Sequence, residues 1–572
     1  MQQVPEILDL GVSRARIPLI ARKMRRCSIF GLIILLTTAC NYPNSPSKPL
    51  RMSGMSRTAG SSQSESNARP EIRRGLPGEP RTLDPQLADD EYSFQVVRDL
   101  FEGLTAEDAQ GRIVPGIASS WTVNKSGTVY TFKLRPQARW SDGSPVTASE
   151  FVEGLRRAVD PRTASGSAEL LQVIKGASSI IAGKRAAHDL GVSAVGENIL
   201  RIELARPAPY ILQVLSQPIA APLRYAMNGI ALESKTKNPA VFDGPFVLLK
   251  RVYGSYIELA RNPFYWDASN VSVDRVRYVI SESEATELRE YLSGQLDMTY
   301  SIPLPDLDKL LSQRPSEVQL APILATFYLA FNLSEPRLRE NLDLRRALSM
   351  AIDRNLIATR IMLGVSPAYS YVPAGIQEYA SQEYEWAQWS RNQRLEYART
   401  YFAKAGYSHD RPLRLRLYFN SDDTIRRVMI AIAENWKQNL GVESSLISNE
   451  FQVFLAGRKD HSRWDIARFG WNADYEDPAS FLEVFARDSP QNDASYSSDK
   501  FNDLVGAART EPDNATRMHL LENAESVLLS DYALIPIYFY KARHLVKPYI
   551  GGAAITPLNH AYSKFLFLKN VR

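Results

Sequence analysis

The densest group of side chains that could take part in chemistry lies in the segment 464–478, which reads WDIARFGWNADYEDP. Its first half has the aromatic and β-branched character of a strand. Asp477 precedes a proline and an apolar run, which predicts a helix N-cap with proline at the first helical position. Asp474 has no such structural explanation. A carboxylate between Trp471 and Tyr475 suits an apolar-walled site for a cation, and an acidic surface loop or a calcium loop is the alternative.

Signatures of enzymes are scarce in this sequence. It contains no H-E-x-x-H, no G-x-S-x-G and no phosphate-binding P-loop. The histidines lie at 188, 409, 461, 519, 544 and 560 without metal-ligand spacing. The S-x-x-K string at 497–500 opens a helical pattern, so we interpret it as helix capping. We therefore expect no enzyme, no cofactor and no metal site.

The elements that must position Asp474 alternate between short β-rich and longer amphipathic segments from about residue 120 onward. Apolar stripes at helical spacing predict helices at 344–352 and 425–436. Asp422 or Asp423 is expected to cap the second helix and Gly441 to end it. This alternation predicts mixed α/β domains. The predicted strands are 129–134, 199–204, 256–260, 275–280, 413–418 and 535–540.

Length and charge limit the function further. A chain of 572 residues is too long for one hydrophobic core. The net charge is +5, but residues 1–75 carry twelve Lys or Arg and four Asp or Glu, so the remainder has a net charge of −3. A mildly acidic body argues against nucleic-acid binding. The two cysteines, Cys27 and Cys40, precede this body, so no disulfide is expected to stabilise it.

The N-terminal segment has the pattern of a secretory signal. A cationic cluster at 22–26 is followed by an apolar run at 29–36 and then Thr-Thr-Ala-Cys, ending at Cys40. The run is too short to span a bilayer. The cysteine after Ala39 resembles the lipobox of bacterial lipoproteins, although Thr37 stands where that motif usually has Leu. We expect a signal peptide over 1–40 with lipidation of Cys40 and a flexible tether over 41–75; an ordinary signal with an incidental cysteine is the alternative.

Several long strings along the rest of the chain carry a family resemblance. They include GLPGEPRTLDPQ, RDLFEGL, GRIVPGIA, ARWSDGSPVTASEFV, VDPRTAS, ARNPFYWD, GQLDMTYS, FGWNADYEDPASF and IPIYFYKARHLVKPYIGG. From about Arg74 to the end, the chain resembles the bacterial oligopeptide-binding proteins of peptide ABC importers. These belong to the extracellular solute-binding family that also contains dipeptide and nickel binders.

The resemblance implies an α/β fold: a two-lobed, periplasmic-binding-protein-like clam with an additional third domain. The first lobe would combine 76–101, 226–325 and 541–572. The additional domain would span 102–225, and the lobe called III would span 326–540. The ligand would lie in the cleft as an extended peptide, paired to the protein by β-augmentation, and lobe closure would be a hinge motion.

The resemblance also assigns roles to individual residues. Asp474 would bind the α-amine of the peptide. Arg468 and Arg458 match cationic positions that can meet the peptide's C-terminal carboxylate. Glu91 would border the peptide backbone. Aromatic pocket walls would come from Trp471, Phe451 and Tyr328.

Three positions depart from the best-known relatives. Ser167 stands in place of a Tyr, Ala330 in place of a Glu, and Phe451 in place of a Trp, so we expect a range of ligands that differs from that of these relatives. The acidic trio Asp89, Asp90 and Glu91 leads to the hypothesis that basic side chains are favoured near the N-terminal half of the peptide. A solvated acidic turn is the equal alternative.

The expected protein is a lipid-anchored, periplasmic or extracellular monomer that delivers short peptides to the permease subunits of an ABC importer. A dipeptide, a murein peptide or a chelated metal remains an alternative ligand, because the fold alone does not fix it. A sensor accessory with the same fold is a further alternative. A peptidase would need an activated nucleophile or a metal.

Overall fold

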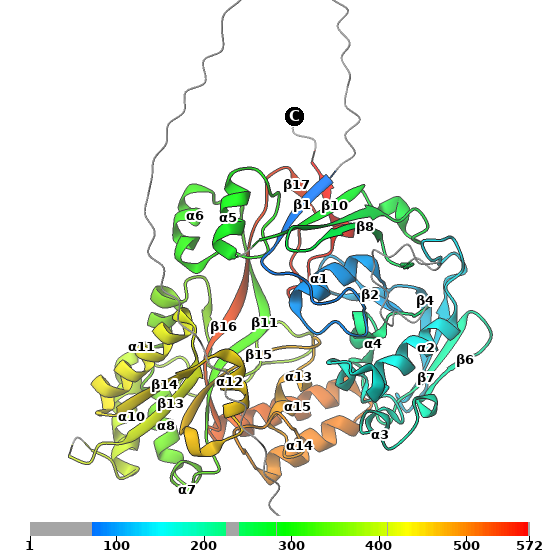
Figure 1. Cartoon of the computed structure of the whole chain (residues 1–572). Helices are drawn as coiled ribbons and strands as arrows, with labels where there is room; N and C mark the ends of the chain where they lie inside the picture. Colours follow the sequence, from blue (N-terminus) through cyan, green and yellow to red (C-terminus); the bar gives the residue numbers. More distant parts are fainter. Residues whose placement is uncertain (1–70, 225–239, 282, 409, 570–572) are drawn as a thin grey trace, which may run out of the picture. The chain divides into compact units, whose positions relative to one another are not determined.

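The computed structural model describes residues 71–224, 240–281, 283–408 and 410–569 (Figure 1). Residues 67–572 form one compact unit. The predicted signal peptide with Cys40, and the tether up to residue 70, lie outside the described residues. Within the described ranges, no helix is both long enough and apolar enough to cross a membrane.

Helices and strands alternate along the described chain, as predicted. The strands are β1 (Glu71–Leu76), β2 (Thr105–Glu107), β3 (Ile113–Pro115), β4 (Ala118–Val123), β5 (Val129–Leu134), β6 (Val192–Ala194), β7 (Ile199–Glu203), β8 (Phe246–Val252), β9 (Tyr256–Arg261), β10 (Arg275–Ile280), β11 (Val318–Phe331), β12 (Ser366–Pro367), β13 (Arg414–Asn420), β14 (Glu443–Asn449), β15 (Ile466–Asn472), β16 (Leu534–Leu545), β17 (Ile550–Gly551) and β18 (Phe567–Leu568). The α-helices are α1 (Glu91–Leu100), α2 (Ala148–Val159), α3 (Ala177–Ile181), α4 (Ile211–Val214), α5 (Glu284–Leu292), α6 (Leu307–Gln313), α7 (Pro336–Arg339), α8 (Leu342–Met350), α9 (Arg354–Leu356), α10 (Arg391–Lys404), α11 (Asp423–Leu440), α12 (Phe451–Gly457), α13 (Ala479–Leu482), α14 (Asp499–Thr510) and α15 (Asn514–Ser530).

Three larger sheets organise these strands. The first has the order β1-β10-β9-β8, the second β4-β5-β7-β6, and the third β12-β16-β11-β15-β13-β14. The predicted strands 129–134 and 275–280 coincide with β5 and β10. One prediction needs correction: residues 71–75, assigned to the tether, form most of β1. This strand pairs in parallel with β10, and that partner, 204 positions away, is not visible from local composition.

The two longest strands, β11 and β16, pair antiparallel and connect the parts of the chain that carry the first and third sheets (Figure 1). Their register is interrupted between Pro322 and Thr326. The expected boundaries at 325/326 and 540/541 therefore divide both strands close to this irregularity. A bulge bends the strand that carries it and increases the local twist, so the direction of this pair changes at that point.

The predicted amphipathic helices are present, with the predicted caps. The Asp422 side chain accepts from the backbone N–H of Ile425 at the start of α11. Gly441 ends that helix in the left-handed conformation, with φ of 72°. Ser498 caps α14, so the S-x-x-K string is a helix start, as interpreted.

Buried apolar side chains form two separate clusters. One gathers residues of the third sheet and its helices. The other gathers residues of the first two sheets, together with Tyr475 from the loop that follows β15. The segment singled out from the sequence therefore crosses from one hydrophobic core to the other.

Candidate functional site

The loop that carries Asp474 joins β15 to α13. Asp477, at its end, accepts a hydrogen bond from the backbone N–H of Ala479 at 2.9 Å, so it does stabilise the helix start. The helix begins one residue later than predicted, because Pro478 rather than Asp477 is the N-cap residue of α13. The same carboxylate receives two hydrogen bonds from Arg517 of α15, at 2.7 and 2.8 Å. Both side chains are buried, so a bidentate ion pair fixes this end of the loop.

Two glutamines hold the backbone of the same loop. Gln217 Nε2 donates to the carbonyl oxygen of Asp474 at 2.5 Å. Gln213 donates to the carbonyl oxygen of Glu476 at 3.1 Å and accepts from its N–H. The glutamines lie 257 and 263 residues before their partners, beside α4 and the 3₁₀ turn that follows it. The loop is therefore fixed to a part of the chain with a different hydrophobic core.

Aromatic and hydroxyl contacts complete this framework. The ring of Tyr475 stacks on that of Tyr210 with 4.3 Å between centroids and 6° between planes. Ser480 Oγ accepts from the N–H of Asp474 at 3.0 Å and lies 3.4 Å from Trp471 Nε1. These contacts hold the backbone N–H and carbonyl groups of Asp474 and Glu476, and they do not involve the carboxylate of Asp474.

That carboxylate has no hydrogen bond and no ion pair within the described part of the chain. The Asp474 side chain is exposed to solvent, but the solvent that it contacts lies inside a cavity whose walls surround the carboxylate. Burial raises the pKa of the Asp474 carboxyl to about 6, and the negative charge of Glu169 adds to this shift. A carboxylate whose charge is disfavoured in this way is stabilised by a cation that enters the cavity.

The cavity has a volume of about 330 Å³ and a mixed polar and aromatic lining. Arg509 Nε lies 3.1 Å from Glu483, and its Nη1 lies 2.9 Å from Asp488. Glu483 and Asp488 therefore each have Arg509 as an ion-pair partner within the lining. Among the described residues, Glu169 and Asp474 are the lining carboxylates without a cation within ion-pair distance. The cavity is therefore negatively charged and suited to a cationic group.

The structure brings together three residues that the sequence singled out. Trp471, Asp474 and Ser167 all line this cavity. Ser167 Oγ donates to the carbonyl oxygen of Ala88 at 3.3 Å.

The two predicted cations lie elsewhere. Arg468 and Trp471 are three residues apart on β15, so their side chains point to opposite faces of the sheet. Among the described residues Arg468 has no carboxylate partner, and its Nε is buried without a hydrogen bond. Arg458 already lies 3.1 Å from Asp493. Arg468 is therefore the cation available to an anionic group, whereas Arg458 is neutralised by the protein.

Two of the predicted aromatic walls do not line the cavity. Tyr328 is only 2% exposed and stacks on Phe469, so it belongs to the core of the third sheet in this structure. Ala330, the position that departs from a Glu, is equally buried. Phe451 is 45% exposed at the start of α12. The structure does not place these residues beside Asp474.

The acidic trio separates into three different environments. Asp89 forms an ion pair with Arg81 at 3.0 Å. Asp90 caps α1 by accepting from the N–H of Ser93 at 2.9 Å. Glu91 is exposed in the first turn of that helix and does not line the cavity. Two members of the trio thus have local structural roles, which is what a solvated acidic turn predicts.

Sequence reasoning missed several residues of the site. Glu169 and Tyr210 come from the second-sheet region, and Glu483 and Arg509 from helical segments after the loop. Only Glu169 had a nearby signal, since it lies four positions after Ser165, the last residue of the string VDPRTAS. The others carry no local pattern, because contacts between distant segments place them at the cavity.

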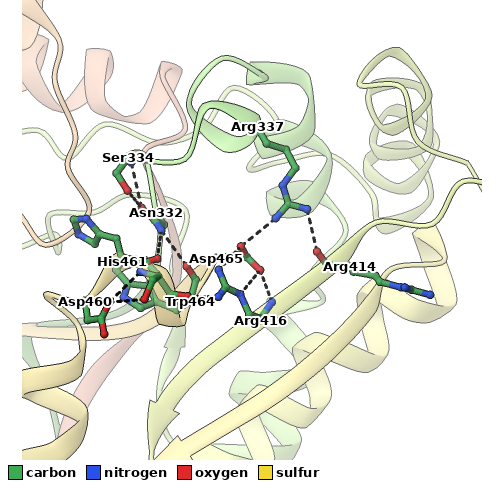
Figure 2. A network of polar contacts seen from close by, with 10 residues as sticks. Asn332, Ser334, Arg337, Arg414, Arg416, Asp460, His461, Trp464 and Asp465 are labelled. Carbon is green, nitrogen blue, oxygen red and sulfur yellow. Dashed lines mark hydrogen bonds and ion pairs between the residues drawn. The ribbon is translucent and has the colours of Figure 1, made fainter.

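A second cluster of charged side chains lies between α7, β13 and the start of β15 (Figure 2). Asp465 bonds to Arg337 at 3.0 Å and to Arg416 at 3.1 Å. Asn332 Nδ2 donates to the carbonyl oxygens of Trp464 and His461 at 3.0 and 2.8 Å. The buried acid and amide in this network are satisfied by the protein, so we assign it a structural role.

A larger cavity, of about 1000 Å³, lies between α10, α11 and β14. Its lining is mainly apolar and includes Phe402, Ile430 and Leu446. We assign the binding site to the smaller cavity, because it contains the unpaired carboxylates. The described residues contain no group of three or more His, Cys, Asp or Glu that could hold a metal ion.

Comparison with known proteins identifies the family. The model for the middle part of the bacterial extracellular solute-binding proteins of family 5 matches residues 112–493. The chain belongs to this family. It is 38% identical to the periplasmic oligopeptide-binding protein OppA of Salmonella typhimurium over 86% of this chain and 91% of that protein. It is 33% identical to the probable deoxycholate-binding periplasmic protein YgiS of Escherichia coli, over 86% and 92%.

Solved structures of relatives share the fold. The unliganded open form of the periplasmic murein tripeptide-binding protein MppA matches with a TM-score of 0.78 and 32% identity, over 88% of this chain and 98% of that one. Haemophilus influenzae OppA in complex with RPPGFSPFR matches with a TM-score of 0.72 and 30% identity, over 88% and 99%. The predicted fold class, an α/β two-lobed binding protein with an additional domain, is confirmed.

Proposed function

We propose that this family member captures short peptides outside the cytoplasmic membrane and delivers them to the permease subunits of an ABC importer. The observation that carries the proposal is the unpaired carboxylate of Asp474, held in a negatively charged cavity by a fixed backbone. A peptide brings a cationic α-amine, which this carboxylate would neutralise. Relatives named for oligopeptide and murein peptide binding support a peptide as the ligand class.

Arg468 is proposed to meet the opposite end of the peptide. Its guanidinium has no carboxylate partner among the described residues, unlike that of Arg458. A peptide carboxylate would supply the bidentate partner that a guanidinium prefers. Ligands that contact both a free carboxylate and a free guanidinium on the protein must carry both charges, as free peptides do.

The charge of the cavity favours a peptide over the other ligand classes in the family. A bile acid such as the one in the name of YgiS is an anion, and two unpaired carboxylates would repel it. A chelated metal is less suited for the same reason when its chelate is anionic. The cavity contains a cation-binding group without the ligand cluster that a bare metal ion needs.

Closure around the peptide would occur at the bulged pair β11 and β16. Their register break between Pro322 and Thr326 is a place where strand direction can change. Contacts from the ligand to both sides of the cleft would favour the closed arrangement, since only a ligand with different affinity for the two states shifts the equilibrium.

The cellular location is part of the proposal. Relatives are named as periplasmic proteins, and the N-terminal pattern of this chain is that of a secretory signal. Lipidation of Cys40 would keep a monomeric protein near the permease. Replacement of Cys40 by Ser should move the protein from the membrane fraction to the soluble fraction; an unchanged distribution contradicts lipid anchoring.

The function is tested by titrating Ala-Ala-Ala into the full-length protein in an isothermal titration calorimeter. We expect saturable binding of one peptide per chain. Mass spectrometry of the mixture after prolonged incubation should recover the peptide intact, whereas a cleaved peptide indicates a peptidase. Loss of peptide uptake in a deletion strain supports import, and unchanged uptake favours a sensor accessory.

A further inference from the structure

The cavity contains more negative charge than an α-amine requires. Arg509 is bonded to Glu483 and Asp488, and Arg206 lies 3.5 Å from Glu483. Asp474 is assigned to the α-amine in the proposed function. Glu169 then remains as a lining carboxylate for which the described residues provide no ion-pair partner.

The position of Glu169 is set by the short 3₁₀ helix Ala168–Leu171. Gly166, just before it, allows this turn to approach α1, because a Cβ at that position would lie 2.9 Å from Cβ of Asp89. Ser167, at the start of the turn, lines the same cavity. Asp89 itself is paired with Arg81, so it does not compete for a cation in the cavity.

Glu169 and Asp474 face one cavity from different parts of the chain. Their charges are near enough that Glu169 contributes to the raised pKa of the Asp474 carboxyl. Apolar and aromatic surfaces of Leu170, Tyr210 and Trp471 line the same space. Long basic side chains pack their methylene groups along such surfaces while their charged ends reach a carboxylate.

We propose that Glu169 makes this protein selective for peptides with Lys or Arg as their first residue. The α-amine of that residue binds Asp474, and its side-chain cation binds Glu169. The inference rests on the proposed function and adds the substrate class. It differs from the hypothesis drawn from the acidic trio, because the carboxylate belongs to another domain and is unpaired.

The test compares peptides that differ only at the first side chain. Calorimetric titration of Lys-Ala-Ala and norleucine-Ala-Ala gives the ratio of their Kd values. This ratio measures how much the side-chain charge contributes to affinity, because the two side chains have nearly the same length. The wild-type protein is expected to bind the lysine peptide at least about tenfold more tightly, the size of a single favourable charge pair. Ala-Lys-Ala, with the charge one residue later, should bind like Ala-Ala-Ala.

The variant Glu169→Gln is expected to remove the preference, so that its Kd values for Lys-Ala-Ala and norleucine-Ala-Ala agree within about threefold. Glu197→Gln is the matched control, since Glu197 is an exposed glutamate of the same domain that does not line the cavity; this variant should keep the preference. Circular dichroism and melting temperature establish that both variants fold.

Three results would overturn the inference. The first is equal affinity of the wild-type protein for the two peptides. The second is a preference that persists in Glu169→Gln. The third is a loss of affinity in this variant that is the same for every peptide with a free α-amine, which would show that Glu169 binds the α-amine rather than the side chain. If any of these results is found while norleucine-Ala-Ala still binds tightly, the role of Glu169 is wrong but the proposed function as a peptide-binding protein is supported. If no peptide binds, both proposals are wrong.

Discussion

At the scale of single residues, the site depends on a carboxylate that has no partner among the residues that the structure describes. Its neighbours satisfy the backbone of Asp474 but not its side chain. The raised pKa follows from this arrangement, because burial penalises the charged form and no cation offsets the penalty. The bound α-amine would supply that cation and would restore a low pKa.

The first prediction concerns the pH dependence of binding. Only the deprotonated Asp474 attracts the protonated α-amine, so affinity for Ala-Ala-Ala should be highest near pH 7, should fall as the pH drops through about 6, and should also fall above about pH 8, where the α-amine loses its proton. Near pH 6, binding should release a fraction of a proton. Titration calorimetry in two buffers with different ionisation enthalpies measures that release. Affinity that is unchanged between pH 5 and pH 8 contradicts the assignment.

The second prediction concerns the stability of the ligand-free protein. The folded-state pKa of Asp474 is raised, so this group stabilises the fold when it is protonated, below its ordinary pKa of 3.8, and that contribution is lost as the pH rises through about 6. Replacement by Asn removes a disfavoured charge at pH 8. The variant should therefore melt at a higher temperature than the wild type at pH 8, and the difference should shrink toward pH 4. A lower melting temperature at pH 8 would contradict this explanation.

The sequence was informative about this residue for a definite reason. Asp477 had a visible structural role, whereas Asp474 between aromatic residues had none, and the structure confirms the contrast. Residues such as Glu169 could not be predicted, because their place depends on a distant segment. Trp471 lines the cavity with Asp474, whereas Arg468 lies outside it on the opposite face of β15, where the proposed function assigns it to the other end of the peptide.

At the scale of elements, the position of the loop depends on the junction of β15, α13 and α15. In Figure 1 the helices α13, α14 and α15 lie together at the end of the third-sheet region. Asp477 connects α13 to α15 through its ion pair with Arg517. The side chains are 5% and 3% exposed, so neither charge has access to solvent if the other is removed.

The third prediction follows from this burial. The variant Asp477→Ala should lower the free energy of unfolding by about 3–5 kcal/mol, because it leaves a buried guanidinium without its partner. The exposed pair Arg414–Glu443 provides the control: Glu443→Ala should cost less than about 1 kcal/mol. Urea denaturation measures both. Equal effects of the two substitutions would contradict the structural role of the buried pair.

Local patterns predicted the elements that have a strong period and clear caps. Helix α11 has both, with Asp422 at one end and Gly441 at the other. The edge strand β14 was not predicted, because it is polar on much of its length and is stabilised by pairing with β13. Strand β1 was missed for the same reason, since its partner β10 is distant in the sequence.

At the scale of the whole molecule, the buried apolar side chains of the described residues form two hydrophobic clusters, and under the proposed function these would be the cores of the parts that close around the ligand. The Asp474 loop already contacts the second core through Tyr475 and Tyr210. A ligand that adds contacts to both parts should therefore stabilise the protein and favour closure. The discontinuous lobes remain a prediction from the family resemblance, because local composition does not show which distant segments share a domain.

The fourth prediction is that peptide stabilises the protein by mass action. At a peptide concentration 100 times Kd, the free energy of unfolding should rise by about 2.7 kcal/mol, and each further tenfold increase should add about 1.4 kcal/mol. Differential scanning calorimetry measures the shift. Small-angle X-ray scattering of the same samples should show a smaller radius of gyration with peptide, and identical curves with and without peptide would contradict closure.

The central claim is that Asp474 binds the α-amine of a peptide, and its most direct test combines one substitution with one chemical modification. Asp474→Asn should weaken binding of Ala-Ala-Ala by roughly two to three decades, the effect of removing one member of a buried charge pair. N-acetyl-Ala-Ala-Ala should bind the wild-type protein as poorly, and it should bind the variant with no further loss. Calorimetric titration of the four combinations provides the answer. If acetylation leaves the affinity of the wild-type protein unchanged, Asp474 does not bind the amine and the account is wrong.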